Sequence, residues 1–244
     1  MRSRIVLVSV LLGVLSSCCA AQSPLDQIRD SIKAARSEKA NSGLSTDKIT
    51  AGLKEALSVS TKNAVALTGR PDGFLKNETI KILVPQKLRT VGNTMRMIGM
   101  GSQVDALEVG MNRAAEQATP AAKQIFIDAI MQMSFDDARQ ILSGGDTAAT
   151  DYFKAKSTDE LTEAFAPIVH QAMENVGVVR QYNQIMQNPM AIRFARSENF
   201  DLDNYVVGKT VDGLFYVMAE EEKKIRKDPM AQTTTLLREV FGRH

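Results

Sequence analysis

The chain has 244 residues, of which 44% are hydrophobic and 24% charged, with 30 basic side chains against 28 acidic ones. This balance is that of an ordinary globular protein and excludes collagen-like, low-complexity and wholly disordered chains. The formal net charge of +2 gives no argument for nucleic-acid binding. Two cysteines are too few for a disulfide framework, and two histidines with no tryptophan leave little for the usual catalytic and metal sites.

The first residues are typical of an export signal. Arg2 and Arg4 precede an apolar run from Ile5 to Leu15, and small residues follow from Ser16 to Ala21. The run is too short for a stable membrane-spanning anchor. We therefore predict a signal peptide over residues 1–17 and export of the chain.

Two cleavage sites compete at the end of this signal. The stretch Leu15-Ser16-Ser17-Cys18 resembles a bacterial lipobox, in which the cysteine becomes the first mature residue and carries lipid, whereas an ordinary cut would fall near Ala20 or Ala21. Several acyl chains anchor a protein where one chain binds only marginally. We favour lipid attachment at Cys18. Position 19, directly after the lipid site, is a cysteine and not an aspartate, which favours a protein anchored on the periplasmic side of the outer membrane. The alternative is a soluble periplasmic protein.

Removal of residues 1–17 changes the composition of the folded body. Arg2 and Arg4 are lost, so 28 basic side chains remain against 28 acidic ones and the mature charge is zero. Both cysteines lie at the processing site. Cysteine nucleophiles, CxxC redox chemistry and cysteine-ligated zinc are therefore excluded from the body.

A tether is predicted over residues 18–43, with a narrow helical stripe between Leu25 and Ala35 that Asn41-Ser42-Gly43 ends. A helix is expected from Ser45 to about Leu67. The only β-like run is 80–84, and because Pro85 closes it we predict an extended connector rather than a sheet strand.

Three helices follow this connector. The first begins near Pro85 and is expected to end at Gly99 or Gly101, and the second covers Ser102 to Ala118. Thr119-Pro120 then begins a helix that is apolar on most of its circumference. Its composition places it at the centre of the bundle.

Capping patterns mark the next helix starts. Ser134 and Ser157 each begin a sequence typical of a capping box. Between them, Gly144-Gly145-Asp146 indicates the end of one helix and an aspartate N-cap on the next. Pro167 predicts a kink or break in the helix that follows.

The rest of the body is also helical in pattern. Residues 187–200 have no clear periodicity and are expected to be a loop, Asp201 begins the longest helix, and Asp228-Pro229 begins a last helix that ends at Gly242. We predict a single all-α domain over 44–242, an irregular bundle of about eight to ten helices with at most one short extended segment near 80–84.

Several strings in this region resemble a known family, the bacterial domain-of-unknown-function family numbered 4197. The longest are Ile141–Thr150 (ILSGGDTAAT) and Glu220–Arg226 (EEEKKIR), and shorter ones include Asp72-Gly73-Phe74, Asn112–Glu116 and Val240-Phe241-Gly242. The resemblance implies an exported, mostly helical envelope protein of a Gram-negative bacterium. It implies no activity and no catalytic residue.

Carboxylates on apolar helix stripes are the sharpest chemical signal. At 100° per residue, Glu108 lies about 40° from Val104, and Glu221 lies about 20° from Leu214. If both face one interior, they form a polar pocket in which the carboxylates share a proton, bind a cation, or pair with Arg113 or Lys224. Asn112 is grouped with them as a pocket residue. The alternative is structural, with Glu221 reaching water at the end of its stripe.

Other candidates have simpler explanations. The Gly144-Gly145-Asp146 turn lacks the length and the lysine of a phosphate loop. His170 projects off the apolar face, where Glu174 is within reach, and lacks the partners for zinc or Ser-His-Asp chemistry. The methionines fill core gaps by default. We predict no catalytic residue, no metal and no cofactor.

Three functions remain open at this stage. The first is a non-enzymatic envelope lipoprotein that binds an apolar ligand or an envelope protein partner and is held to the membrane by its N-terminal lipid. The second is a carboxylate-dependent hydrolase using Glu108 and Glu221, which needs the two carboxyl groups within about 5–10 Å of each other. The third is an assembly protein whose Leu25–Ala35 stripe pairs with another chain.

Overall fold

The computed structural model describes residues 46–175, 177–187 and 201–228, together with residues 231 and 238. All of them belong to one compact unit, Leu44–His244. The predicted signal peptide (1–17), the lipid site at Cys18, the tether (18–43) and most of the last helix lie outside the described residues. So does the predicted loop (187–200), except for Gln187, which is the last residue of a helix.

Regular structure in the described part is entirely helical, which confirms the all-α prediction. The α-helices are α2 (Thr46–Gly69), α3 (Arg89–Met97), α4 (Gly101–Ala118), α5 (Ala122–Gln132), α6 (Phe135–Ser143), α7 (Ala148–Asn175), α8 (Val178–Gln187) and α10 (Leu202–Lys227). Two 3-10 helices, η1 (Gln86–Leu88) and η2 (Thr119–Ala121), precede α3 and α5. Segment 80–84 is extended but pairs with no strand in these ranges, as predicted for a connector.

Two of the predicted helix caps are present. The Ser134 side chain accepts the backbone N–H of Asp137, whose carboxylate accepts the N–H of Ser134, so α6 begins with a full capping box. Asp201 is the N-cap of α10, and its side chain accepts the backbone N–H of Asn204 at 2.9 Å. In both places the local sequence signal sets the first turn.

The predicted helix start at Ser157 is wrong. Helix α7 runs unbroken from Ala148 to Asn175, passes through Pro167, and buries Ser157 in its interior. Phe153 and Leu161 lie four residues to either side of Ser157, and both are fully buried. The three residues therefore share one buried face, and the packing of that face outweighs the local capping signal.

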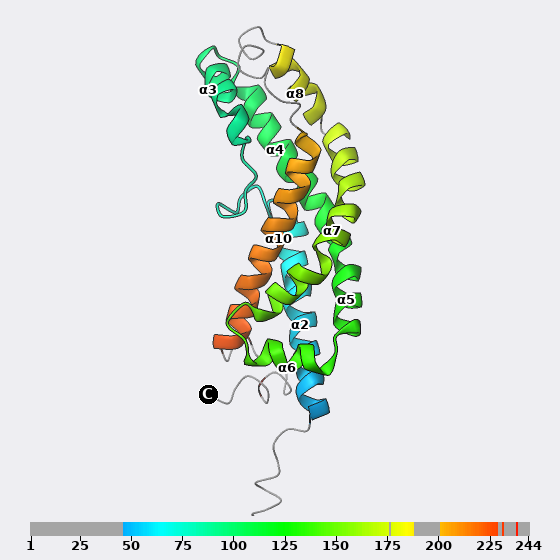
Figure 1. Cartoon of the computed structure of the whole chain (residues 1–244). Helices are drawn as coiled ribbons and strands as arrows, with labels where there is room; N and C mark the ends of the chain where they lie inside the picture. The colour runs from blue at the N-terminus through cyan, green and yellow to red at the C-terminus, as the bar shows by residue number, and fades with distance from the viewer. Residues whose placement is uncertain (1–45, 176, 188–200, 229–230, 232–237, 239–244) are drawn as a thin grey trace, which may run out of the picture. The chain divides into compact units, whose positions relative to one another are not determined.

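The centre of the bundle is α10, which packs against α2, α4 and α7 (Figure 1). The prediction that the helix after Thr119-Pro120 is central is wrong. Helix α5 packs against α2 and α7 only on one side, and its Met131 is 72% exposed. The helix is apolar on most of its circumference, but a surface helix can expose single apolar residues without an unfavourable patch.

Phenylalanine rings fill the core between these helices. The ring of Phe126 on α5 meets the rings of Phe153 on α7 and Phe215 on α10 edge to face, with centroids 5.4 and 6.1 Å apart. Such contacts add to the burial of the rings themselves. The interior at this level is filled by side chains.

The connector, defined here as residues 70–85 between α2 and η1, is seated against α10 at Gly213. A Cβ atom at Gly213 would lie 2.6 Å from Cε1 of Phe74, closer than real contacts allow, and 3.2 Å from Cβ of Ile80, which is tighter than most. Phe74 and Ile80 are both buried. The missing side chain of Gly213 therefore lets the connector approach the central helix.

Candidate functional site

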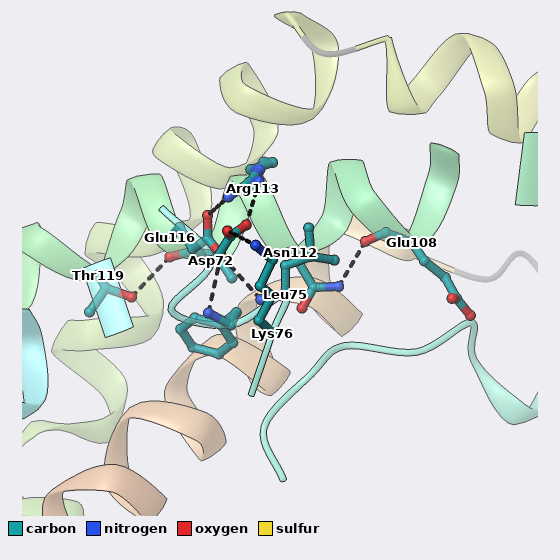
Figure 2. Close-up of polar contacts among 10 residues, drawn as sticks. Asp72, Leu75, Lys76, Glu108, Asn112, Arg113, Glu116 and Thr119 are labelled. Carbon is teal, nitrogen blue, oxygen red and sulfur yellow. Dashed lines mark hydrogen bonds and ion pairs between the residues drawn. The ribbon is translucent and has the colours of Figure 1, made fainter. Parts of the chain in front are cut away.

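Three polar side chains at four-residue spacing on α4 hold the connector in place. They are Glu108, Asn112 and Glu116, which we call the α4 ladder. Figure 2 shows the three ladder residues on α4, with Glu116 accepting the backbone N–H of Leu75 in the connector. Asn112 and Glu108 accept backbone N–H groups further along the connector. Residues four apart lie on the same side of a helix, so one face of α4 supplies hydrogen bonds to a segment that has no neighbouring strand in the described part.

Asn112 lies at the middle of the ladder and is completely buried. Its Oδ1 accepts the backbone N–H of Ile82 at 2.9 Å, and its Nδ2 donates to the carbonyl oxygen of Ile82 at 2.8 Å. The same Nδ2 donates to the backbone carbonyl of Glu108 at 2.7 Å. The amide thus satisfies both backbone groups of one connector residue, as a neighbouring β-strand would.

Glu116 binds the other end of the connector and is 4% exposed. Its Oε1 accepts the backbone N–H groups of Phe74 and Leu75, both at 3.1 Å. Its Oε2 accepts from Arg113 at 2.6 Å. A buried carboxylate needs such donors, because removing its charge from water without partners is costly.

An ion-pair chain extends from Glu116 to the surface. Arg113 also donates to Asp72 at 2.7 Å, and Lys76 pairs with Asp72 at 2.7 Å. Hydrogen bonds from Lys76 and then Arg113 lower the pKa of Asp72, and hydrogen bonds to Glu116 and then Asp72 raise the pKa of Arg113. Asp72 has a positive φ of 67°, which aspartate tolerates better than most residues. The charges here stabilise the turn that begins the connector.

Glu108 closes the ladder at the far end. Its Oε1 accepts the N–H of Val84 at 3.3 Å, and its Oε2 lies 4.0 Å from Nη2 of Arg96. Glu108 and Asn112, which the sequence analysis groups in one polar pocket, therefore do lie on the same face of α4 and bind the same segment. Both contact connector backbone, and neither is among the residues that line the two hollows described below.

Glu221 lies elsewhere on the molecule. Its Oε2 accepts from Asn63 at 3.3 Å and its Oε1 from Lys224 at 2.5 Å. Glu108 instead contacts Val84, next to Leu83, whose carbonyl accepts the hydroxyl of Tyr205.

The separation between the two carboxylates follows from α10. Tyr205 and Glu221 are sixteen residues apart on this helix, which is about 24 Å at 1.5 Å per residue. Glu108 lies at the Tyr205 end, since both contact neighbouring connector residues. The structure does not bring Glu221 to Glu108, and the spacing of about 5–10 Å that a carboxylate pair needs is not met.

Two open hollows flank the connector on the side of α10. The first, about 410 Å³, lies between residues 79–89 and the first half of α10, and its lining includes Lys81, Arg89 and Lys209. The second, about 730 Å³, is lined in part by Asp72, Lys76, Glu221 and Lys224. Thr79 and Tyr216 line both, so the hollows adjoin each other. Their volumes fall in the range of small-ligand sites.

The two longest family-like strings meet at the other end of α10. The carboxylate of Glu222 accepts the N–H of Ala149 at 2.9 Å and that of Thr150 at 2.8 Å, and thereby caps α7 from a different helix. Arg226 binds Glu222 at 2.8 Å and the carbonyl of Ile141 at 2.9 Å. The N-terminus of α7, a place where anions bind in many proteins, is thus filled by the protein's own carboxylate.

The predicted N-cap role of Asp146 is wrong. Asp146 pairs with Lys227, and this contact lowers the pKa of its carboxyl group. Gly144 ends α6 as predicted, but in an extended conformation rather than a left-handed one. The capping charge comes from α10, because the buried Glu222 also requires the two backbone donors at this helix start.

His170 bridges α7 and α10 at the surface. Its Nδ1 lies 2.6 Å from the carboxylate of Asp203, and its Nε2 lies 3.6 Å from that of Glu174. The hydrogen bond to Asp203 raises the pKa of His170, with the charges of Asp203 and Glu174 acting in the same direction. Among the described residues, no three His, Cys, Asp or Glu side chains gather to hold a metal ion.

No role for Glu116 or Glu222 is predicted from the sequence. The signal available for Glu116 is its four-residue spacing from Asn112 and Glu108, which places three polar groups on one helix face. For Glu222 the neighbouring charges resemble a solvated helix face, and only the packing of α10 on α7 shows that it is buried.

None of the described helices combines the length and hydrophobicity needed to cross a membrane.

The chain belongs to the family described as "Protein of unknown function (DUF4197)", whose model matches residues 43–242. Searches of curated proteins and of solved structures found no match.

Proposed function

We propose that this protein is a non-enzymatic helical binding protein of the cell envelope, held at the periplasmic face of the outer membrane by lipid on Cys18. The tether rests on the lipobox-like stretch Leu15–Cys18 and on the basic, then apolar, segment before it. The binding role rests on the hollows beside the connector.

One observation carries the binding role. The buried carboxylates and Glu108 are all engaged: Glu108 and Glu116 with connector backbone, Glu221 with Lys224, and Glu222 with the start of α7. Carboxylates held by donors in this way stabilise structure and are poorly placed for acid–base chemistry. The bonds of Glu108 and Glu116 also fix the connector, and so give the adjoining hollows a preformed wall.

A rigid wall favours binding because less freedom is lost when the ligand arrives. The connector is fixed at both ends by the α4 ladder and at its middle by Gly213, where Phe74 and Ile80 approach α10. The hydrolase alternative, in contrast, is unsupported, because Glu108 and Glu221 are held at different ends of α10.

The tether is tested by metabolic labelling with radioactive palmitate in a Gram-negative host. We expect label on the wild-type protein in the outer-membrane fraction and its loss in Cys18→Ser. Cys19→Ser is the matched control and should keep both label and fraction. Label that persists in Cys18→Ser, or a wild-type protein found in the cytoplasm, would refute the tether.

Binding is tested by native mass spectrometry of the wild-type protein extracted from membranes. We expect a population that carries a non-covalent adduct in addition to the acylated chain. A spectrum that contains only the unliganded mass would refute ligand binding, whatever the result for the tether.

A further inference from the structure

We propose that the first hollow, called here the connector groove, binds an amphiphilic anion: a carboxylate or phosphate joined to an acyl or similar apolar tail. The connector groove is the hollow of about 410 Å³ between residues 79–89 and α10. The proposal rests on the proposed binding function and names the chemical class of its ligand.

The first observation is that the lining of the groove is positively charged. Lys81, Arg89 and Lys209 line it, and Asp212 is its one acidic side chain. Asp212 lies 3.5 Å from Lys209, whereas Lys81 and Arg89 have no carboxylate partner within the described ranges. Cations gathered in a hollow without counter-charges attract an anion and raise its local concentration.

The adjoining hollow is a useful contrast, because its lining holds more carboxylates (Asp72, Glu78, Glu220 and Glu221) than cations (Arg70, Lys76 and Lys224). There Lys76 pairs with Asp72, and Lys224 pairs with Glu221. The two hollows share Thr79 and Tyr216 and the same connector, yet of the two only the groove has more cations than carboxylates in its lining. Its excess of positive charge is therefore local to residues 81–89 and the first half of α10.

A backbone donor adds to this charge. Ile82 and Val84 turn their N–H groups toward α4, where Asn112 and Glu108 accept them. In an extended chain the residue between them directs its N–H and C=O to the opposite edge. The C=O of Leu83 accepts the Tyr205 hydroxyl at 3.0 Å, so this edge faces α10 and the groove. The Leu83 N–H has no acceptor among the described residues, and an oxyanion in the groove would accept it.

The apolar part of the ligand is indicated by the rest of the lining. Leu83 and Tyr216 are each 45% exposed, and both line the groove together with the buried Ile80 and Val84. Exposed apolar side chains beside a cluster of cations match a ligand that has a charged head and an apolar tail. A bare inorganic anion would leave these side chains in water.

The test is isothermal titration of the purified protein with four probes: decanoate, decyl phosphate, neutral decyl glucoside and inorganic phosphate. We expect decanoate and decyl phosphate to bind one molecule per chain, and decyl glucoside and inorganic phosphate to bind at least about tenfold more weakly. Octanoate should bind more weakly than decanoate by about threefold to fourfold for each methylene that leaves the groove. Comparing decanoate with decyl phosphate shows which head group the site prefers.

Two variants and a control locate the site. Arg89→Gln and Lys209→Gln are each expected to weaken decanoate binding by about fivefold to tenfold and to reduce its salt dependence. Lys154→Gln removes an exposed charge from α7, away from the groove, and should leave the affinity unchanged. Circular dichroism should show the wild-type helix content for all three.

Several results would overturn the proposal. If decyl glucoside binds as tightly as decanoate, the groove recognises only the apolar tail. If inorganic phosphate binds as tightly as decyl phosphate, the groove recognises only the anionic head group. Unchanged affinity in Arg89→Gln and Lys209→Gln, or no binding of either anionic amphiphile, would also refute it. A neutral adduct in the native mass spectrum would refute this inference but keep the binding function, whereas a spectrum without any adduct would refute the binding function itself.

Discussion

Replacing Asn112 with alanine is expected to release residue Ile82 of the connector from α4. The substitution removes the only partners of the Ile82 N–H and C=O among the described residues, and each orphaned backbone group costs about 1–3 kcal/mol. The carbonyl of Glu108 loses little, because it remains inside α4 and keeps its helical bond. We therefore expect Asn112→Ala to lower the free energy of unfolding by about 2–5 kcal/mol.

The measurement is urea unfolding followed by circular dichroism, with hydrogen exchange of individual amides. The midpoint should fall, and the amides of Ile82 and Val84 should lose protection before those of the helices. Asn183→Ala, an exposed asparagine of α8, is the matched control and should change stability by less than about 0.5 kcal/mol. If Asn112→Ala and the control behave alike, the α4 ladder does not hold the connector and the argument for a preformed groove wall fails.

Further substitutions test other parts of the fold. Gly213→Ala should destabilise the protein by about 1–3 kcal/mol, since the new methyl group would lie 2.6 Å from the buried ring of Phe74. Gly208→Ala, on the same helix, places its methyl group where no atom lies within 4 Å, and should stabilise the protein by about 0.5–1 kcal/mol. Glu222→Ala should cost about 3–5 kcal/mol, because two helix N–H groups lose their acceptor and the mostly buried Arg226 loses its ion pair with Glu222. The Asp203 contact raises the pKa of His170, so its stabilising effect should be complete below pH about 6.5 and disappear as the pH rises through the folded-state pKa.

Each of these predictions has its own control. For the capping charge, Glu220→Ala removes an exposed partner of Lys223 and should cost less than about 1 kcal/mol in urea unfolding. For the histidine, His170→Gln should flatten the dependence of the unfolding midpoint on pH, while Glu174→Gln should reduce it only partly. A Glu222→Ala midpoint equal to that of Glu220→Ala, or a His170→Gln profile identical to wild type, would contradict the corresponding contact.

The helical class and most helix ends follow from the sequence, because they depend on neighbours a few residues apart. Ser134 and Asp201 each cap a helix by accepting the backbone N–H three residues further on. The extended part of the connector, residues 80–84, is recognised from its short β-like run and from Pro85. Where packing opposes the local signal, as at Ser157, the prediction is wrong. There the buried face shared with Phe153 and Leu161 extends the helix through the capping pattern.

The candidate site divides in the same way. The positions of Glu108 and Asn112 on one face of α4 are predictable from their spacing, but their partners are connector residues 24 and 30 positions away. A carboxylate on an apolar stripe looks the same in sequence whether it meets another carboxylate, a cation or a backbone N–H. Only the tertiary structure decides that Glu108 binds the connector, that Glu221 meets Asn63 of α2, and that Glu222 caps α7, because each of these partners is supplied by an element that folding brings from another part of the chain.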